Sequence, residues 1–333
     1  MARASKEVLQ AAIIGFGIPT VLLILAIFFY LPGKVQPHQP SEGMDLTDPS
    51  TVTMPDLDST VLIWVEMDED RIQMDLEDYV VGAVLSEMPA SFELEALKAQ
   101  SVAARTYALQ TCNSSTKHAG AICTSHSCCQ GYLTDEDYLL LGWHEKYIER
   151  VRQAVTETAG QVLVYDGALI RAPYFSCSGG ATESAVTVWG RDYPYLQSVE
   201  SPGEEETVYY THAKTFDLLE FQEKLGITLS GKPESWFGNF TYTTGGGIAS
   251  MEIGGVAYRG TTLRSLLGLR STVFQVVVSE NAIRFETRGY GHRVGMSQYG
   301  ADAMAKEGSS YIQILSHYYQ GTELIDQSLV PEL

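Results

Sequence analysis

The chain has 333 residues, with 22 lysines and arginines against 41 acidic residues, a formal charge of −19. This balance excludes a nucleic-acid-binding protein held by attraction to phosphates. A composition that is 45% hydrophobic and 19% charged also excludes a disordered or collagen-like chain and indicates a globular protein with a substantial core.

The N-terminal segment predicts a membrane anchor. Residues 11–32 form an uncharged apolar run long enough to cross a hydrocarbon core of roughly 30 Å as a helix. A cleavable signal peptide is the competing interpretation, but the run exceeds a usual signal-peptide apolar region and no small-residue cleavage pattern follows it. Because Arg3 and Lys6 precede the run, we expect residues 1–10 in the cytoplasm and the bulk of the chain outside, as a single-pass membrane protein.

Residues 33–59 are rich in Pro, Asp and Ser and show no sustained apolar period, so they predict an acidic linker. The folded region is expected over 60–333. It starts with a strand at 61–67, followed by a helix over 75–86 with apolar residues at helical spacing. Pro89 cannot continue that helix, which places Glu87 at its end, where a side chain can project into a cleft.

A second helix is expected over 93–111, a stretch built from strong helix formers. Lys98 and Arg105 lie seven residues apart and therefore project from nearly the same side of that helix. Two interpretations remain open. The two cations bind an anionic substrate or hold a nearby carboxylate charged, or each pairs with an acid of its own surroundings.

Residues 112–130 change character and predict a loop dense in thiols and imidazoles. Its candidate metal ligands are Cys112, His118, Cys123, His126, Cys128 and Cys129. Thiolates and imidazoles are what a tetrahedral Zn²⁺ site requires, although the spacing matches no standard pair of cysteines. A disulfide through Cys112 or Cys123 is the competing interpretation outside the cytoplasm.

The C-terminal half is rich in strands, expected at 161–167, 271–278 and 282–288, with a helix near 261–267. The fold class is therefore α+β. Two glycine-rich turns, at 178–180 and 289–292, allow the backbone to approach a ligand closely and can form the floor of a sugar groove. Tyrosine rings suit sugar faces, and the chain has 19 of them.

Several motifs resemble, in order, the SpoIID/LytB-type domain family. They are SEMPASFELEALKAQSVAARTYAL at 86–109, PYFSCSGGATESAVTVWG at 173–190, DYPYLQSVESP at 192–202, GTTLRSLLGLRSTVF at 260–274, GYGHRVGMSQYGA at 289–301 and ILSHYYQGTEL at 314–324. The resemblance spans roughly residues 60–325, and the N-terminal apolar segment is a further feature that agrees with the family.

This resemblance implies a lytic transglycosylase that cuts peptidoglycan glycan strands, prefers strands without stem peptides, and leaves 1,6-anhydro-muramic ends. It places the catalytic acid on Glu87 and its supporting residues on Lys98 and Arg105. The remaining substrate-binding candidates lie in the later motifs: Ser178, Gly179, Tyr195, His292 and Tyr299.

The resemblance also implies a structural zinc rather than a cofactor for catalysis. The zinc site described for some members falls on the 118–129 loop, where Cys123 and Cys129 match the paired cysteines. Cys128 stands where some relatives have a histidine, and His118 completes the expected ligand set. The implied setting is the extracytoplasmic side of the sporulation septum, in engulfment, with a peptidoglycan amidase or endopeptidase and a membrane scaffold protein as partners.

Three other functions compete with this one. A wall-binding module that enhances a partner amidase would keep the groove without needing Glu87. A zinc hydrolase would use the cysteine and histidine loop for catalysis, but several thiolates without an H-E-x-x-H helix favour a structural metal. Cys177 is a candidate thiol nucleophile, although a structural thiol explains its surroundings equally well.

Overall fold

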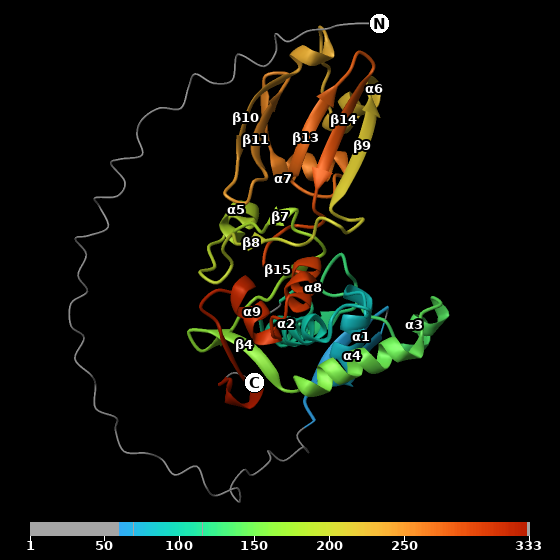
Figure 1. The fold of residues 1–333 in the computed structure, drawn as a ribbon, viewed down its shortest axis with the longest axis vertical. Coiled ribbons are helices and arrows are strands. Elements are labelled where there is room, and N and C mark those ends of the chain that lie inside the picture. Colours follow the sequence, from blue (N-terminus) through green and yellow to red (C-terminus); the bar gives the residue numbers. More distant parts are fainter. Residues whose placement is uncertain (1–59, 69, 115, 332–333) are drawn as a thin grey trace, which may run out of the picture. The chain divides into compact units, whose positions relative to one another are not determined.

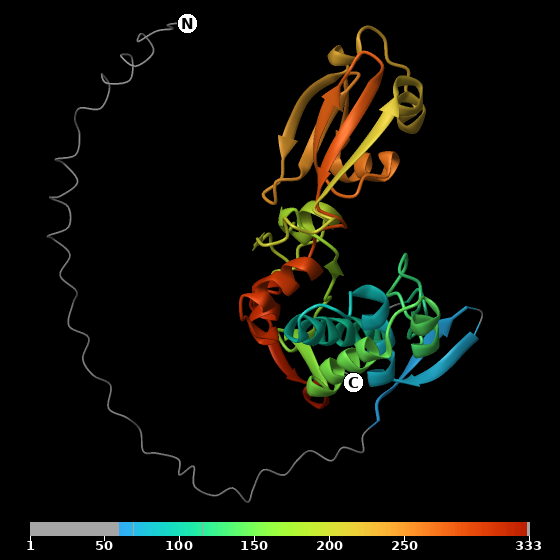
Figure 2. The same cartoon turned by 45° about the vertical axis from the view of Figure 1, so that its right-hand side comes forward.

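A β-hairpin opens the part of the chain that the computed structural model describes, residues 60–68, 70–114 and 116–331. Strands β1 (Leu62–Met67) and β2 (Asp70–Asp75) pair antiparallel, and Figure 2 shows them at the edge of the helices that follow. The expected cytoplasmic segment, membrane helix and linker lie outside the described residues. Within those residues, no helix combines the length and the apolarity that a bilayer crossing requires.

Two consecutive helices form the centre of the first lobe (Figure 1). Helix α1 (Leu76–Glu87) begins at Asp75, whose carboxylate accepts hydrogen bonds from the Glu77 and Asp78 backbone N–H groups and so caps the helix. Helix α2 (Leu94–Ser114) is buried along most of its length, as its small side chains allow. The predictions of a first strand and of these two helices are confirmed, with Glu87 as the last residue of α1.

Other elements surround α1 and α2 and complete one apolar core. They are β3 (Ala121–Cys123), α3 (Asp135–Leu140), α4 (Glu145–Glu157), β4 (Gln161–Tyr165), β5 (Ala168–Leu169), β6 (Tyr174–Phe175), β15 (Met296–Ser297), α8 (Gln298–Lys306), α9 (Tyr311–Tyr318) and β16 (Glu323–Asp326). Residues 112–130 were predicted to form a loop, and this was wrong at the start and in the middle of the segment. Helix α2 extends through Ser114, and β3 pairs in parallel with β1 because its apolar residues are buried there.

A second lobe with its own core is inserted between residues 210 and 289. Its elements are β9 (Thr211–Asp217), α6 (Leu218–Leu225), a short 3₁₀ helix (Pro233–Ser235), β10 (Phe237–Tyr242), β11 (Ile248–Ile253), β12 (Val256–Arg259), α7 (Gly260–Leu267), β13 (Val273–Val278) and β14 (Ala282–Arg288). Two antiparallel sheets, in the orders β13-β14-β9 and β10-β11-β12, enclose a cluster of aromatic rings. Thr211 pairs with Arg288, so the chain enters and leaves the lobe at one point.

A buried ion pair ties this insertion to the segment between the lobes, which includes β7 (Gly180–Ala181), α5 (Ala185–Trp189) and β8 (Glu200–Ser201). The Arg293 guanidinium bonds to Glu183 at 3.1 Å and donates to the carbonyl of Gly245, in the turn between β10 and β11. Both charged side chains are only 1% exposed. The expected α+β class, the strands of the C-terminal half and the helix near 261–267 agree with this arrangement.

Candidate functional site

A cleft of about 1170 Å³ lies at the C-terminal end of α1. Its walls come from residues 85–91, the 126–130 loop, the connection around α3 and α4, the 171–176 segment, α7, residues 290–292 and the start of α8. Aromatic side chains are frequent in this lining, among them Trp143, Trp189 and Tyr290, each at least 41% exposed. An aromatic-lined cleft of this size suits a carbohydrate chain, whose ring faces are apolar.

Glu87 lies in this cleft, half-buried, as the last residue of α1. Its Oε1 accepts a hydrogen bond from the Gly131 backbone N–H at 2.5 Å, and its own backbone carbonyl accepts one from the Gln298 side chain at 2.9 Å. Burial raises the pKa of the Glu87 carboxyl, and the Gly131 hydrogen bond and the nearby His126 oppose that shift. A carboxyl group with a raised pKa retains its proton closer to neutral pH, as a general acid requires.

Gly131 is a tightly restricted position next to Glu87. A Cβ at this position would overlap the Ser86 hydroxyl and come within 3.0 Å of Glu87 Oε1. A glycine at this position therefore lets the backbone N–H reach the Glu87 carboxylate without moving the Ser86 or Glu87 side chain.

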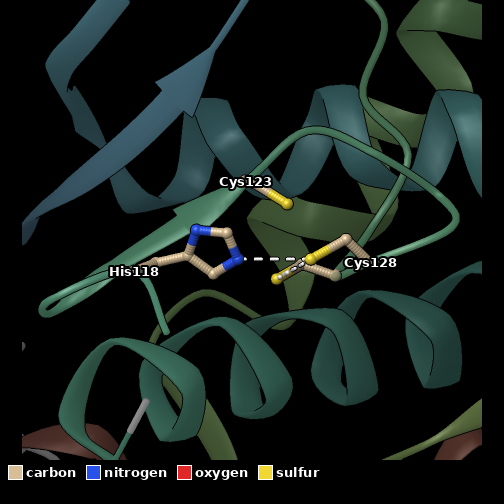
Figure 3. Close-up of side chains that lie close together, drawn as sticks. His118, Cys123 and Cys128 are labelled. Atoms are coloured by element: carbon tan, nitrogen blue, oxygen red, sulfur yellow. Dashed lines mark hydrogen bonds between the residues drawn. The ribbon is translucent and has the colours of Figure 1, made fainter. Parts of the chain in front are cut away.

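A cluster of potential metal ligands is built by the loop that precedes Gly131. His118, Cys123, Cys128 and Cys129 each present one ligand atom, and these atoms all lie within 4.8 Å of one another. Figure 3 shows the His118, Cys123 and Cys128 side chains turned toward a common centre. The four residues are the predicted ligand set. The other two candidates are elsewhere, since Cys112 lies near the end of α2 and His126 lines the cleft.

The donor atoms fit a tetrahedral zinc site. The sulfur atoms of Cys128 and Cys129 are 3.8 Å apart, the separation expected, about 3.8 Å, when two thiolates bind one Zn²⁺ at about 2.3 Å. His118 Nε2 is 3.2 Å from Cys128 Sγ, while His118 Nδ1 is 2.6 Å from a Glu66 oxygen. A carboxylate on the second ring nitrogen is the usual support of a metal-binding histidine.

The protonation of the thiols favours a cation as well. The Lys117 ammonium donates to Cys128 Sγ at 2.7 Å and lowers the pKa of that thiol to about 6. Burial raises the pKa of Cys129 to about 12, so that thiol needs a bound cation to lose its proton near neutral pH. All five cysteines of the chain are free thiols, and the competing disulfide through Cys112 or Cys123 is not formed.

Lys98 and Arg105 are not brought to the cleft, which corrects the expectation that they support Glu87. Lys98 bonds to Glu95 and Glu157 at 2.8 and 2.6 Å. Arg105 is fully buried, and its guanidinium donates in a bidentate manner to Glu77 at 2.8 and 2.5 Å. Their contacts are those of the second interpretation, in which each cation pairs with an acid of its own surroundings.

Three other predicted substrate-binding residues also lie behind the cleft. Ser178 is buried and donates through both its backbone N–H and its hydroxyl to Glu204, at 2.7 and 2.8 Å. The backbone of Gly179 packs against that of Arg288 and Gly289, so its turn joins two chain segments rather than forming a floor. Tyr195 does not line the cleft, but its hydroxyl accepts a hydrogen bond from the backbone N–H of Arg171, which does.

His292 and Tyr299 do line the cleft. The His292 ring packs between Phe175 and Trp189, with centroids 5.6 and 5.4 Å away, and burial together with the nearby Arg264 lowers its pKa to about 4. It is therefore neutral near pH 7. Tyr299 belongs to a row of rings with Phe92 and Tyr209.

Cys177 does not fit the role of a nucleophile. The side chain is completely buried, its S–H group donates to Glu204 at 3.1 Å, and burial beside that carboxylate raises its pKa far above the usual range. It is absent from the lining of the cleft.

Sequence reasoning missed several functional positions. Gly131, Gln298, Arg171, Arg264 and Glu66 were not among the candidates, although the first four border or face the cleft and the last supports His118. Gly131 directly follows the cysteine-rich loop, and that adjacency was the one available signal. The others come from chain segments whose proximity only the tertiary structure reveals.

Known proteins resemble this chain over most of its length. The family model described as SpoIID, stage II sporulation protein, matches residues 69–165. Stage II sporulation protein D of Bacillus subtilis (strain 168) is 38% identical over 291 residues, which cover 85% of this chain and 82% of that protein. The protein of the same name from Bacillus amyloliquefaciens is 40% identical over 256 residues, covering 75% and 74%. A protein named amidase enhancer, also from Bacillus subtilis (strain 168), is 30% identical over 301 residues, covering 73% of this chain and 40% of that protein.

Proposed function

The chain belongs to the SpoIID family of stage II sporulation proteins, and from that premise we propose that it is a peptidoglycan lytic transglycosylase. The reaction cleaves the glycan between N-acetylmuramic acid and N-acetylglucosamine and leaves a 1,6-anhydro-muramic end. One observation carries the proposal: Glu87 is the only carboxyl side chain in the described lining of a large cleft rich in aromatic rings.

Glu87 supplies both proton transfers in the proposed mechanism. Because the Gly131 N–H occupies Oε1, the proton of the neutral acid resides on Oε2. That proton passes to the glycosidic oxygen as its bond to C1 breaks. The C6 hydroxyl of the same muramic residue then bonds to C1 and returns its proton to the Glu87 carboxylate, which restores the acid.

The presence of a single carboxylate in the described lining favours intramolecular attack by the C6 hydroxyl over hydrolysis by water. Ordinary glycosidases need two, about 5–5.5 Å apart when retaining and about 6.5–9.5 Å apart when inverting, to handle the acid and the nucleophile or water. The described lining offers Glu87 without a second aspartate or glutamate. An internal hydroxyl nucleophile removes the need for that second group.

A bound zinc ion would have a structural role in this proposal. Residues 126–130 of the ligand loop form one wall of the cleft, and Gly131, which follows them directly, donates its backbone N–H to Glu87. His118, Cys123, Cys128 and Cys129 would hold the ion and thereby fix this wall, and the ion would supply no step of the reaction.

The proposed setting is the extracytoplasmic side of the sporulation septum, during septal wall degradation and engulfment. The N-terminal apolar segment would anchor the chain with residues 1–10 in the cytoplasm. The proposed partners are an amidase or endopeptidase that removes stem peptides beforehand and a membrane scaffold protein that recruits both enzymes.

A non-catalytic enhancer of an amidase is the second candidate function, favoured by the relative whose printed name is amidase enhancer. Mass spectrometry of products from peptide-free glycan strands separates the two functions. We expect anhydro-muramic products from the full-length chain in mild detergent and none from its Glu87→Gln variant. Reducing-end products would indicate a hydrolase, and strand binding without products from either protein would indicate the enhancer.

A further inference from the structure

The cleft has the opposite electrostatic character to the chain as a whole. Acidic residues make up 41 of 333 positions, about one in eight, yet Glu87 is the only one in the described lining. Arg171 and Arg264 belong to the same lining. With Glu87 in its protonated form, the cleft therefore presents positive charge and suits an anionic ligand.

Arg264 forms no ion pair with any residue that the structure describes. It lies in the last turn of α7, half-buried, and its one hydrogen bond among the described residues runs from Nε to the Arg270 carbonyl at 3.2 Å. Burial lowers the pKa of this guanidinium, and the nearby Tyr290 partly opposes that shift. Its terminal nitrogens remain available as donors toward the cleft.

Arg171 has the same property on the opposite lobe. Its backbone is fixed by the Tyr195 hydroxyl at 3.1 Å, and its guanidinium lies over the Tyr193 ring, 5.9 Å from the centroid. The side chain forms no hydrogen bond or ion pair within the described part of the chain. By contrast, the buried cations away from the cleft, Arg105 and Arg293, each bond to a carboxylate.

We propose that Arg171 and Arg264 bind the free carboxylates of muramic acid residues along the glycan strand. This inference rests on the proposed function and names the feature of the substrate that the site selects. N-acetylglucosamine is neutral, whereas the lactyl group of muramic acid ends in a carboxylate when no peptide is attached and in a neutral amide when one is. The planar guanidinium matches a carboxylate with two parallel hydrogen bonds.

Two arginines on separate lobes also fit a polymer that repeats its carboxylate at every second sugar. A strand with attached peptides would place an uncharged amide opposite each arginine and leave a half-buried guanidinium unpaired, which lowers affinity. The selection for peptide-free strands would then be electrostatic as well as steric.

The test compares binding of two glycans to the full-length chain in mild detergent, with Glu87→Gln present in every protein so that no strand is cut. One glycan is the peptide-free strand, and the other is the same strand with its carboxyl groups converted to neutral methylamides. We expect the free strand to bind at least tenfold more tightly by titration calorimetry. Arg264→Gln should reduce this preference about tenfold. Arg171→Gln, which replaces an exposed arginine, should reduce it about threefold.

Matched variants separate recognition from folding. Arg264→Lys retains the charge and should keep part of the preference, while Arg284→Gln, an exposed arginine of β14 that pairs with Glu286, should leave it unchanged. Equal affinity for the two glycans, or a preference that persists in folded Arg171→Gln/Arg264→Gln protein, would overturn the inference. Cleavage by the chain with Glu87 intact is measured separately, so carboxylate preference without anhydro products would overturn the proposed function alone.

Discussion

The buried ion pair between Glu77 and Arg105 allows a quantitative test of what Arg105 does. The substitution Glu77→Gln removes the negative charge and leaves the guanidinium, which is 0% exposed, with neutral acceptors: the Gln161 and Val155 carbonyls at 3.1 and 3.4 Å and the amide oxygen of the substituted side chain. Removing one partner of a buried pair costs about 3–5 kcal/mol because the remaining charge is uncompensated. Since the Glu77 side chain is 32% exposed, we expect the lower end of that range, about 3 kcal/mol.

Urea unfolding followed by circular dichroism measures this change, and thermal unfolding should show a decrease of about 6–12 °C in Tm. Turnover per folded molecule should stay unchanged in Glu77→Gln, because neither residue lines the cleft. Arg105→Lys should behave in the same way, with a loss of stability and normal turnover of the folded fraction. If Arg105→Lys instead abolished turnover while the unfolding free energy stayed at the wild-type value, Arg105 would act on the substrate and the structural assignment would be incorrect.

Four further predictions concern the cleft and the metal-ligand loop beside it. Because the folded-state pKa of Glu87 is raised, the charged form of this side chain is disfavoured in the folded protein. Glu87→Gln should therefore be more stable than the wild type above that pKa, and the difference should disappear as the pH falls below the ordinary glutamate pKa. Urea titrations across pH 4–8 measure this difference in unfolding free energy. The same shift predicts that kcat/KM falls as pH rises through the raised pKa, and an alkaline limb at the pKa of an ordinary glutamate would contradict it. Gly131→Ala should reduce turnover at least tenfold, with Gly238→Ala, at an exposed glycine of β10 whose nearest neighbour is the Glu252 side chain, as the control for a glycine substitution away from the cleft. Zinc removal by a chelator should release one ion per chain and lower both Tm and turnover, and full turnover of a metal-free, folded sample would refute the structural role of the site.

Local sequence signals predicted the secondary structure near Glu87 well. The helix predicted over 75–86, with Pro89 as its stop, agrees with α1 almost to the residue, and the structure shows that Asp75 caps its start. The strand at 282–288 has the predicted bounds, since its alternating apolar residues face the core of the second lobe. The insertion of that lobe between two paired strand ends was not predicted, because strand pairing across more than seventy residues depends on tertiary contacts.

For the candidate site as well, the sequence predicted what depends on neighbouring residues and missed what depends on tertiary packing. The four ligands of the 118–129 loop were found because they are neighbours in sequence, and their proximity in space follows from a short loop. Lys98 and Arg105 were placed correctly on one side of α2, but helical periodicity does not say what that side faces. In the structure it faces Glu77 and α4, not Glu87.

The charge pattern of the cleft connects these findings. A general acid needs its proton, and a cation next to Glu87 would lower its pKa and oppose that role. Arg105 is neutralised by Glu77, and Lys98 by Glu95 and Glu157, so neither exerts a net charge on the acid. The two arginines without a carboxylate partner among the described residues, Arg171 and Arg264, instead lie in the 171–176 wall and on α7, where they can bind substrate carboxylates. The fold thus separates the charges that hold an anionic strand from the carboxyl group that must stay neutral to cut it.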